Sequence, residues 1–233
     1  MPVPYFYTTT IQNDVLTLDE ETSRHIVQVL RMEKADHIRL TDGHGHSADA
    51  EITTAHKKHC VVAIQSREFS PQPTNQVSIA ISLIKNTSRF EWFLEKATEL
   101  GTTEIIPLLC TRTESEKFKL ERFTGICKSA MLQSQQTWLP RLQEPVAFME
   151  LINNCDHHQR FIAHCADDDK EHLAAAYDAM LDSHLILIGP EGDFTPEEIM
   201  AAKNAGFVPV SLGNTRLRTE TAGIFAAAVC NSF

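Results

Sequence analysis

The apolar run L-I-L-I at 185–188, followed at once by G-P-E-G-D-F at 189–194, constrains the fold of this chain more than any other stretch. A short apolar run that ends at glycine and proline is typical of a buried strand. Thr195, Pro196 and Glu198 then give a capping threonine, a proline at the first helical position and a glutamate that completes a capping box. The sequence here predicts a strand, a loop and a helix in succession.

A second passage of the same kind closes the chain. A short strand, F-V-P-V at 207–210, leads into the turn-rich segment S-L-G-N-T-R-L-R-T-E-T-A at 211–222, and the apolar run at 222–229 predicts a final helix. Strand ends of this kind meet at one edge of an α/β sheet, which is where ligands of open α/β folds bind. We therefore expect two glycine-containing loops to lie together at one edge.

Strands and helices also alternate upstream. A strand is expected over 77–84, and Ser88 with Glu91 predicts a second capping box, which opens a helix that stops at Gly101. The next strand, E-I-I-P-L-L at 104–109, makes a βαβ unit and hence a parallel pair. Further elements are a helix over 117–137, a strand over 161–165, a helix within 169–181 and a strand over 184–188.

The N-terminal part instead reads as a small β-barrel, with Asp19 capping a helix. Its strands are expected over 3–7, 15–18, 37–41, 48–52 and 61–64. The segment S-P-Q-P-T-N at 70–75 has two prolines and no apolar residue, so it predicts the boundary between a domain over 1–70 and one over 75–233. A chain of 233 residues has room for two such domains.

Composition narrows the class of protein. No apolar run is long enough to span a membrane and the N-terminus lacks a signal-peptide layout, so we expect a cytoplasmic protein with no membrane partner. The six cysteines contain no C-x-x-C pair, which predicts reduced, mostly buried thiols. A net charge of -10 argues against binding nucleic acid through the overall field, although 71–144 carries nine basic against eight acidic residues. Any RNA contact must therefore come from local patches.

Several common sites are not indicated. The sequence has neither a G-x-x-x-x-G-K-[ST] motif nor a G-x-G-x-x-G motif after a strand, which argues against a nucleoside triphosphatase and a dinucleotide-binding dehydrogenase. Histidine pairs at 44/46, 56/59 and 157/158 lack a nearby set of carboxylates and cysteines, so we expect polar surface there and no metal site.

The loop at 189–194 allows close backbone approach to a ligand, or is simply a tight turn. Arg218 and Glu220 are either a structural ion pair or a charge-stabilising donor with a proton acceptor.

Several motifs together resemble one known family. They are G-P-E-G-D-F at 189–194, L-G-N-T-R-L-R-T-E-T-A at 212–222, R-F-E-W-F-L-E-K-A-T-E-L-G at 89–101, H-I-V-Q-V-L-R at 25–31, D-G-H-G at 42–45 and L-Q-S-Q-Q-T-W-L-P at 132–140. In their order along the chain they are similar to the ribosomal RNA small subunit methyltransferase E family, the uracil-N3 methyltransferases of 16S ribosomal RNA in the SPOUT superfamily. The chain departs at Asp193, where the family commonly has glycine, and at Met131-Leu132, where an acidic lead-in is usual.

The resemblance implies an α/β fold, with a PUA-like RNA-binding β-barrel before a SPOUT domain that carries a deep trefoil knot. It implies S-adenosyl-L-methionine as cofactor, bound in a bent form by the turn after 161–165 and the loops at 189–194 and 211–218, and a homodimer. The expected substrate is a uridine of 16S ribosomal RNA, presented on the small ribosomal subunit, with naked transcript a poor substrate.

Site residues follow from the same resemblance. Arg218 would stabilise charge on the uracil carbonyls, while Glu220 or Glu191 would accept the N3 proton. The expected cofactor-binding residues are Gly189, Pro190, Glu191, Gly192, Leu212, Gly213, Leu217, Arg218 and Ala222. The expected RNA contacts are Arg31, Lys85, Arg89, Gln133, Ser134 and Arg216. Two alternatives stay open: another SPOUT enzyme that modifies a different position or a ribose 2′-hydroxyl, and a non-catalytic RNA-binding assembly factor.

Overall fold

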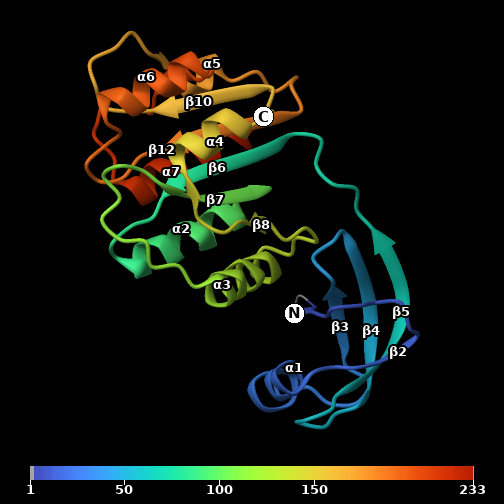
Figure 1. Ribbon diagram of the computed structural model, residues 1–233. Coiled ribbons are helices and arrows are strands. Elements are labelled where there is room, and N and C mark those ends of the chain that lie inside the picture. The colour runs from blue at the N-terminus through green and yellow to red at the C-terminus, as the bar shows by residue number, and fades with distance from the viewer. Residues whose placement is uncertain (1–2, 233) are drawn as a thin grey trace. The chain divides into compact units, whose positions relative to one another are not determined.

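The computed structural model describes residues 3–232, and contacts divide the chain into two compact units (Figure 1). Unit 1 comprises Met1–Gln72 and Met131–Leu139, and unit 2 comprises Pro73–Ala130 and Pro140–Phe233. The sequence places residues 131–139 in the second domain, whereas the contacts group them with the first. Across the described residues, no helix is long and apolar enough to span a bilayer.

Unit 1 is built on a five-stranded sheet of order β1-β3-β4-β5-β2. The strands are β1 Tyr5–Tyr7, β2 Val15–Thr17, β3 His37–Thr41, β4 His46–Thr54 and β5 Val61–Phe69. Helix α1, Glu20–Arg24, continues into a π-helical turn, η1 His25–Val29, and Asp19 caps α1 as predicted by accepting a hydrogen bond from the backbone N–H of Thr22 at 2.8 Å. Alternate strand residues, among them Ile38, Leu40 and Ile52, are buried in one core with Ile26 of η1.

The segment 131–139 packs within unit 1 on the turn between β3 and β4. Its Leu139 N–H donates to Gly43 O, and Gly45 N–H donates to Thr137 O, both at 2.9 Å. Gly45 has φ +88, and a Cβ there would lie 2.6 Å from the Trp138 ring, so glycine is required. Two motifs far apart in the sequence are thereby joined.

Unit 2 contains an eight-stranded, all-parallel sheet of order β11-β13-β10-β12-β6-β7-β8, with β9 also paired to β7. The strands are β6 Gln76–Ser82, β7 Glu104–Leu109, β8 Arg141–Leu142, β9 Val146–Ala147, β10 Gln159–Ala163, β11 Glu171–His172, β12 Ser183–Ile188 and β13 Val208–Ser211. The helices are α2 Thr87–Glu99, α3 Leu120–Gln133, α4 Phe148–Asn154, α5 Leu173–Ala176, α6 Pro196–Asn204 and α7 Thr219–Cys230. The predicted parallel pairing of β6 and β7 is confirmed.

Helices cover both faces of this sheet because successive strand residues point to opposite sides. Leu185 and Leu187 of β12 share a core with residues of α4 and α6. The opposite face meets α2 and α7 so closely that a Cβ on Gly223 would lie 2.6 Å from the ring of Phe93 and 2.9 Å from Ile81 Cδ1. The chain is therefore an α/β protein with the sheet buried between two helical layers.

Two sequence predictions need correction. Helix α2 begins at Thr87, capped by Asn86, whose side-chain oxygen accepts from the N–H of Ser88 at 3.0 Å, so Ser88 is not the cap. The helix expected within 169–181 is reduced to the four residues of α5, since β11 pairs with β13 just before it. The capping box of Thr195 and Glu198 in α6 is confirmed.

Candidate functional site

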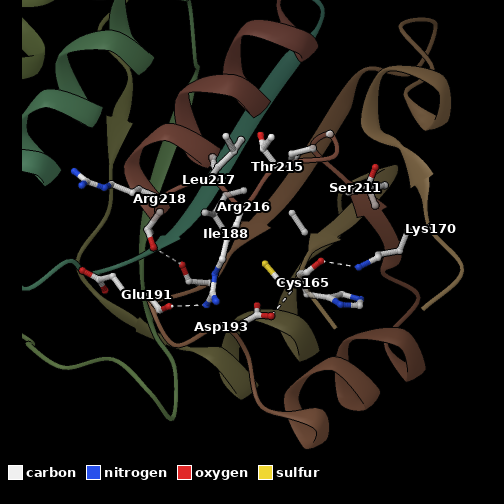
Figure 2. Close-up of a pocket in the computed structure, with 18 of the residues that line it drawn as sticks. Cys165, Lys170, Ile188, Glu191, Asp193, Ser211, Thr215, Arg216, Leu217 and Arg218 are labelled. Atoms are coloured by element: carbon white, nitrogen blue, oxygen red, sulfur yellow. Dashed lines mark hydrogen bonds between the residues drawn. The ribbon is translucent and has the colours of Figure 1, made fainter. Parts of the chain in front are cut away.

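Three parallel strands of unit 2 end side by side at the carboxyl edge of the sheet. Ala163 of β10 is in register with Ile188 of β12 and with Val210 of β13. The loops that follow these strands surround a cavity of about 540 Å³ (Figure 2). The two glycine-containing loops thus meet at one sheet edge, as the sequence predicts.

The loop after β12 is fixed mainly by Asp193. Its N–H closes a turn onto Pro190 O at 2.9 Å, and its φ of +64 is the left-handed conformation that glycine adopts most readily. The Asp193 carboxylate accepts from the N–H of Cys165 at 2.8 Å, which ties this loop to the one after β10. Within residues 3–232, the N–H groups of Glu191 and Gly192 donate to no protein acceptor.

The start of this loop is packed against its own end. A Cβ on Gly189 would lie 3.1 Å from the ring of Phe194, which is buried in the core. The hydroxyl of Thr219, at the start of α7, donates to Gly189 O at 3.0 Å. The loop therefore has a defined backbone path and is more than a generic turn.

The loop after β13 forms the opposite wall. Gly213 has φ +118, and a Cβ added there would meet no atom within 4 Å, so its backbone borders open space. Arg216 reaches across and donates to Glu191 O at 3.4 Å. Figure 2 places the side chains of Arg218 and Glu191 on one side of the cavity and those of Lys170 and Ser211 on the other. Arg218 forms no ion pair with any described residue.

The loop after β10 contributes a buried histidine and a lysine. Lys170 Nζ donates to His164 O at 2.8 Å and to Ala166 O at 2.6 Å, and these two bonds fold the loop back on itself. Burial, and next the positive charge of Lys170, lowers the pKa of the His164 imidazole. His164 is consequently neutral at pH 7 and adds no charge to the cavity.

Most residues expected to bind cofactor border the cavity. The lining includes Gly189, Pro190, Glu191, Leu212, Gly213, Leu217, Arg218 and Ala222. Gly192 is in the same loop but does not line the cavity. Of the expected RNA contacts, only Arg216 lines it.

The remaining expected RNA contacts lie in both units. Arg31, exposed with φ +56, follows η1 in unit 1, and Gln133 and Ser134 belong to the segment grouped with that unit. Lys85 and Arg89 follow β6 in unit 2, where Lys85 pairs with Glu114 at 3.1 Å.

Glu220 differs from the other expected catalytic residues. It is 4% exposed, does not line the cavity, and its Oε1 lies 3.6 Å from Arg89 Nε. Its Oε2 is buried without a hydrogen-bond partner among the described residues. Helix α7 begins at Thr219, three residues earlier than predicted, so Glu220 lies in its first turn.

Sequence reasoning missed several residues of the site. Asp193, His164, Lys170 and Thr219 line the cavity, and Arg112 holds the back of the 189–194 loop. Arg112 follows β7 at the same carboxyl edge, so strand order combined with a search of every strand end would have found it.

The arrangement suits a ligand that is partly apolar and partly polar. Ile188, Val210, Leu212 and Leu217 give the cavity an apolar lining, while the neighbouring loops supply backbone donors and carbonyls. Arg216, Arg218 and Glu191 add two guanidinium groups and a carboxylate to the lining.

Family models match both parts of the chain. The model described as an RNA methyltransferase domain matches residues 70–231, and the model described as an RNA methyltransferase PUA domain matches residues 18–65. The first match covers the whole carboxyl-edge cavity.

Individual relatives agree with these matches. The ribosomal RNA small subunit methyltransferase E of Bacillus subtilis is 31% identical over 220 residues, covering 88% of this chain and 85% of its own. A probable rRNA methyltransferase from Porphyromonas gingivalis superposes with a TM-score of 0.89 at 38% identity, covering 97% and 95%. The Neisseria gonorrhoeae ribosomal RNA small subunit methyltransferase E, crystallised with S-adenosyl methionine, gives 0.85 at 28% identity, covering 97% and 95%. The chain belongs to the ribosomal RNA small subunit methyltransferase E family.

Proposed function

We propose that this protein transfers a methyl group from S-adenosyl-L-methionine to N3 of a uridine in 16S ribosomal RNA of the small subunit. The observation that carries the proposal is the cavity at the carboxyl edge of the sheet, enclosed by three loops with unpartnered backbone N–H groups and flanked by Arg218 and Glu191. Family membership and the cofactor bound to the Neisseria relative support it.

The residues present fit this cofactor. A cavity of about 540 Å³ lies within the usual range for sites that take such a molecule. Gly213 borders open space, so the backbone of the 211–218 loop can come close to an adenosyl group. The N–H group of Glu191, which lines the cavity and has no protein acceptor among the described residues, is available as a donor for a polar atom of the cofactor. When bound, S-adenosyl-L-methionine supplies an electrophilic methyl group on a sulfonium.

The chain's own residues would supply positioning and proton removal. N3 of neutral uracil carries a proton, so that proton must leave as the N–C bond forms and the S–C bond breaks. Arg218, which forms no ion pair with another described residue, is free to stabilise negative charge growing on the uracil carbonyl oxygens. Holding N3 in line with the methyl group contributes further.

Of the two carboxylates, we assign proton acceptance to Glu191. Glu191 is exposed and lines the cavity, whereas Glu220 is buried outside it beside Arg89. A general base must come within hydrogen-bond reach of the proton, directly or through one water. Glu220 instead holds Arg89 in place as a positioning residue.

The homodimer is also a proposal, and it is argued from the surface of helix α7. Helix α7 has one charged residue, the buried Glu220, and leaves Ile224, Ala228 and Val229 only half-buried. A helix that is apolar on all sides normally packs in an interior, so we propose that a second copy covers α7 in a cytoplasmic homodimer. The deep trefoil knot stays a prediction. Sedimentation of the wild type and of Val229→Asp tests the dimer, since a charge at a dry interface would leave the variant monomeric.

The deciding experiment for the function is methyl transfer from labelled S-adenosyl-L-methionine to small subunits isolated from a strain that lacks this protein. We expect incorporation at one uridine, mapped to N3 by mass spectrometry, and weak labelling of naked 16S transcript. Methyl at a ribose 2′-hydroxyl or another base would identify a different RNA methyltransferase. If calorimetry showed that the protein does not bind S-adenosyl-L-methionine, a non-catalytic assembly factor would replace the enzyme.

A further inference from the structure

The turn after β7, residues 110–114, grips the loop after β12, although β6 lies between these two strands in the sheet. Arg112 Nη1 donates to Gly192 O at 2.7 Å and to Phe194 O at 3.4 Å. The aliphatic part of Arg112 also covers Gly192, because a Cβ there would lie 3.3 Å from Arg112 Cδ. Neither residue lines the cavity, so Arg112 holds the loop from its outer side.

The same turn also fixes the start of α6. The backbone N–H and hydroxyl of Thr111 donate to Glu198 Oε1 at 2.8 and 3.0 Å. Glu198 is buried and uses Oε2 to accept from the N–H of Thr195, which closes the capping box. Loop 189–194 is thereby held at both its bend and its exit.

The turn is itself anchored in the sheet. Thr113 Oγ1 accepts from the N–H of Cys110 at 2.9 Å and shares a hydrogen bond of 2.9 Å with the hydroxyl of Ser82, at the end of β6. These contacts connect Arg112 to two central strands, so its guanidinium is held by a rigid support.

The Arg112 bonds fix particular peptide planes. Since a peptide unit is planar, holding Gly192 O also sets the direction of the Asp193 N–H, which donates to Pro190 O. Holding Phe194 O likewise sets the N–H of Thr195 on Glu198. Pro190 O shares its peptide unit with the N–H of Glu191, which has no partner among the described residues, so this N–H is presented in a fixed direction before any ligand arrives.

We propose that Arg112 is a positioning residue for the methyl donor: it clamps the carbonyls of Gly192 and Phe194 so that the loop keeps its cofactor-binding shape. The inference rests on the proposed function and assigns a role to a residue outside the cavity. Arginine suits this role because its planar guanidinium offers several N–H donors in a fixed geometry, whereas the ammonium group of lysine is a compact charge without that fixed geometry.

The test compares Arg112→Ala, Arg112→Lys and, as a matched control, Arg122→Ala, which removes an exposed arginine paired with Glu91 on the same unit. Because Arg112→Ala removes charge-assisted hydrogen bonds, we expect calorimetry to show that it binds S-adenosyl-L-methionine about tenfold more weakly than the wild type. Arg112→Lys should recover part of this affinity, and the control should bind the cofactor as the wild type does. KM for the cofactor should rise by the same factor, with little change in kcat at saturation.

Other outcomes would overturn the inference. Unchanged cofactor affinity in Arg112→Ala would show that the clamp is dispensable, and a rise in KM for ribosomal subunits alone would make Arg112 an RNA contact. Gly192→Ala serves as a second variant, because the added Cβ would crowd Arg112. Gly192→Ala should therefore weaken cofactor binding less in the Arg112→Ala background than in the wild type. If the losses of binding free energy in the two variants were strictly additive, this would contradict the contact. Failure of the wild type to bind the cofactor would instead overturn the proposed function.

Discussion

The two edges of the parallel sheet in unit 2 use polar residues in opposite ways. At the amino edge, Ser78 Oγ donates to Glu104 Oε2 at 3.0 Å and lies 3.1 Å from His157 Nε2, so the three side chains form one buried chain of hydrogen bonds. At the carboxyl edge, Arg218 has no ion pair and two backbone N–H groups have no protein partner among the described residues.

This difference between the two edges indicates that one edge of the sheet serves stability and the other serves function. At the amino edge, Ser78, Glu104 and His157 bond to one another, and Ser78 and Glu104 are costly to disturb because they are buried. Groups at the carboxyl edge are left available, and the loops that carry them are fixed by contacts between the loops and by Arg112 from outside the cavity. We therefore expect substitutions at the carboxyl edge to change activity and substitutions at the amino edge to change the free energy of unfolding.

The largest effect should come from Arg218→Ala. If Arg218 stabilises the uracil anion in the transition state, kcat should fall about 10²- to 10³-fold while calorimetric affinity for S-adenosyl-L-methionine and the unfolding free energy change little. Single-turnover labelling of isolated small subunits measures this directly. A wild-type rate in a variant that binds cofactor normally would remove Arg218 from the mechanism.

Glu191→Gln and Glu220→Gln form a pair that separates the two carboxylates. Glu191→Gln should lower kcat about a hundredfold and change the pH dependence of the rate, because it removes the proton acceptor. Glu220→Gln should mainly raise KM for the small subunit by releasing Arg89. The assignment of the base would be reversed if Glu220→Gln lost the pH dependence and Glu191→Gln kept it.

Acid pH should weaken the amino edge. Burial, followed by the charge of His157, lowers the pKa of His184 to about 4, and burial also lowers the pKa of His157. The unfolded chain takes up the proton near pH 6.5, whereas the folded chain takes it up only near pH 4. The protein is therefore most stable above about pH 6.5, and its free energy of unfolding decreases as the pH falls toward 4.

For His184 alone this amounts to about 2 to 3 kcal/mol between pH 7 and pH 4. Urea unfolding at both pH values, compared with His184→Gln, measures it, since glutamine keeps a donor near Leu181 O but does not titrate. Equal pH dependence in the two proteins would show that His184 is not the source.

The smallest expected effect is that of Ser78→Ala. Removing its hydroxyl leaves Glu104 and His157 each without one partner and should lower the unfolding free energy by about 1 to 2 kcal/mol. The kcat of methyl transfer should stay at the wild-type value, because Ser78 is at the edge opposite the cavity. A large loss of activity without a loss of stability would break the separation between the two edges.

Local patterns predicted the elements around the site well. The capping box of Thr195 and Glu198 depends on residues three apart, so the sequence carried the whole signal. His157 shows the limit of that approach: it was expected on polar surface, yet its ring is half-buried on Ser78, 79 positions away in the sequence. The helix expected within 169–181 is only the four residues of α5, because β11 pairs with β13 just before it, and local propensity does not show that pairing.

The sequence by itself determined the alternation of strands and helices, the two glycine-containing loops and, through its motifs, the family. Only the tertiary structure decided that Glu220 is buried beside Arg89, that residues 131–139 group with the first unit, and that Arg112 holds a loop 80 positions away. The physical reason is that helix caps and turns are set by neighbouring residues, whereas these contacts join residues far apart in the sequence. The contact of Arg112 depends in addition on strand order, which places β6 between β7 and β12.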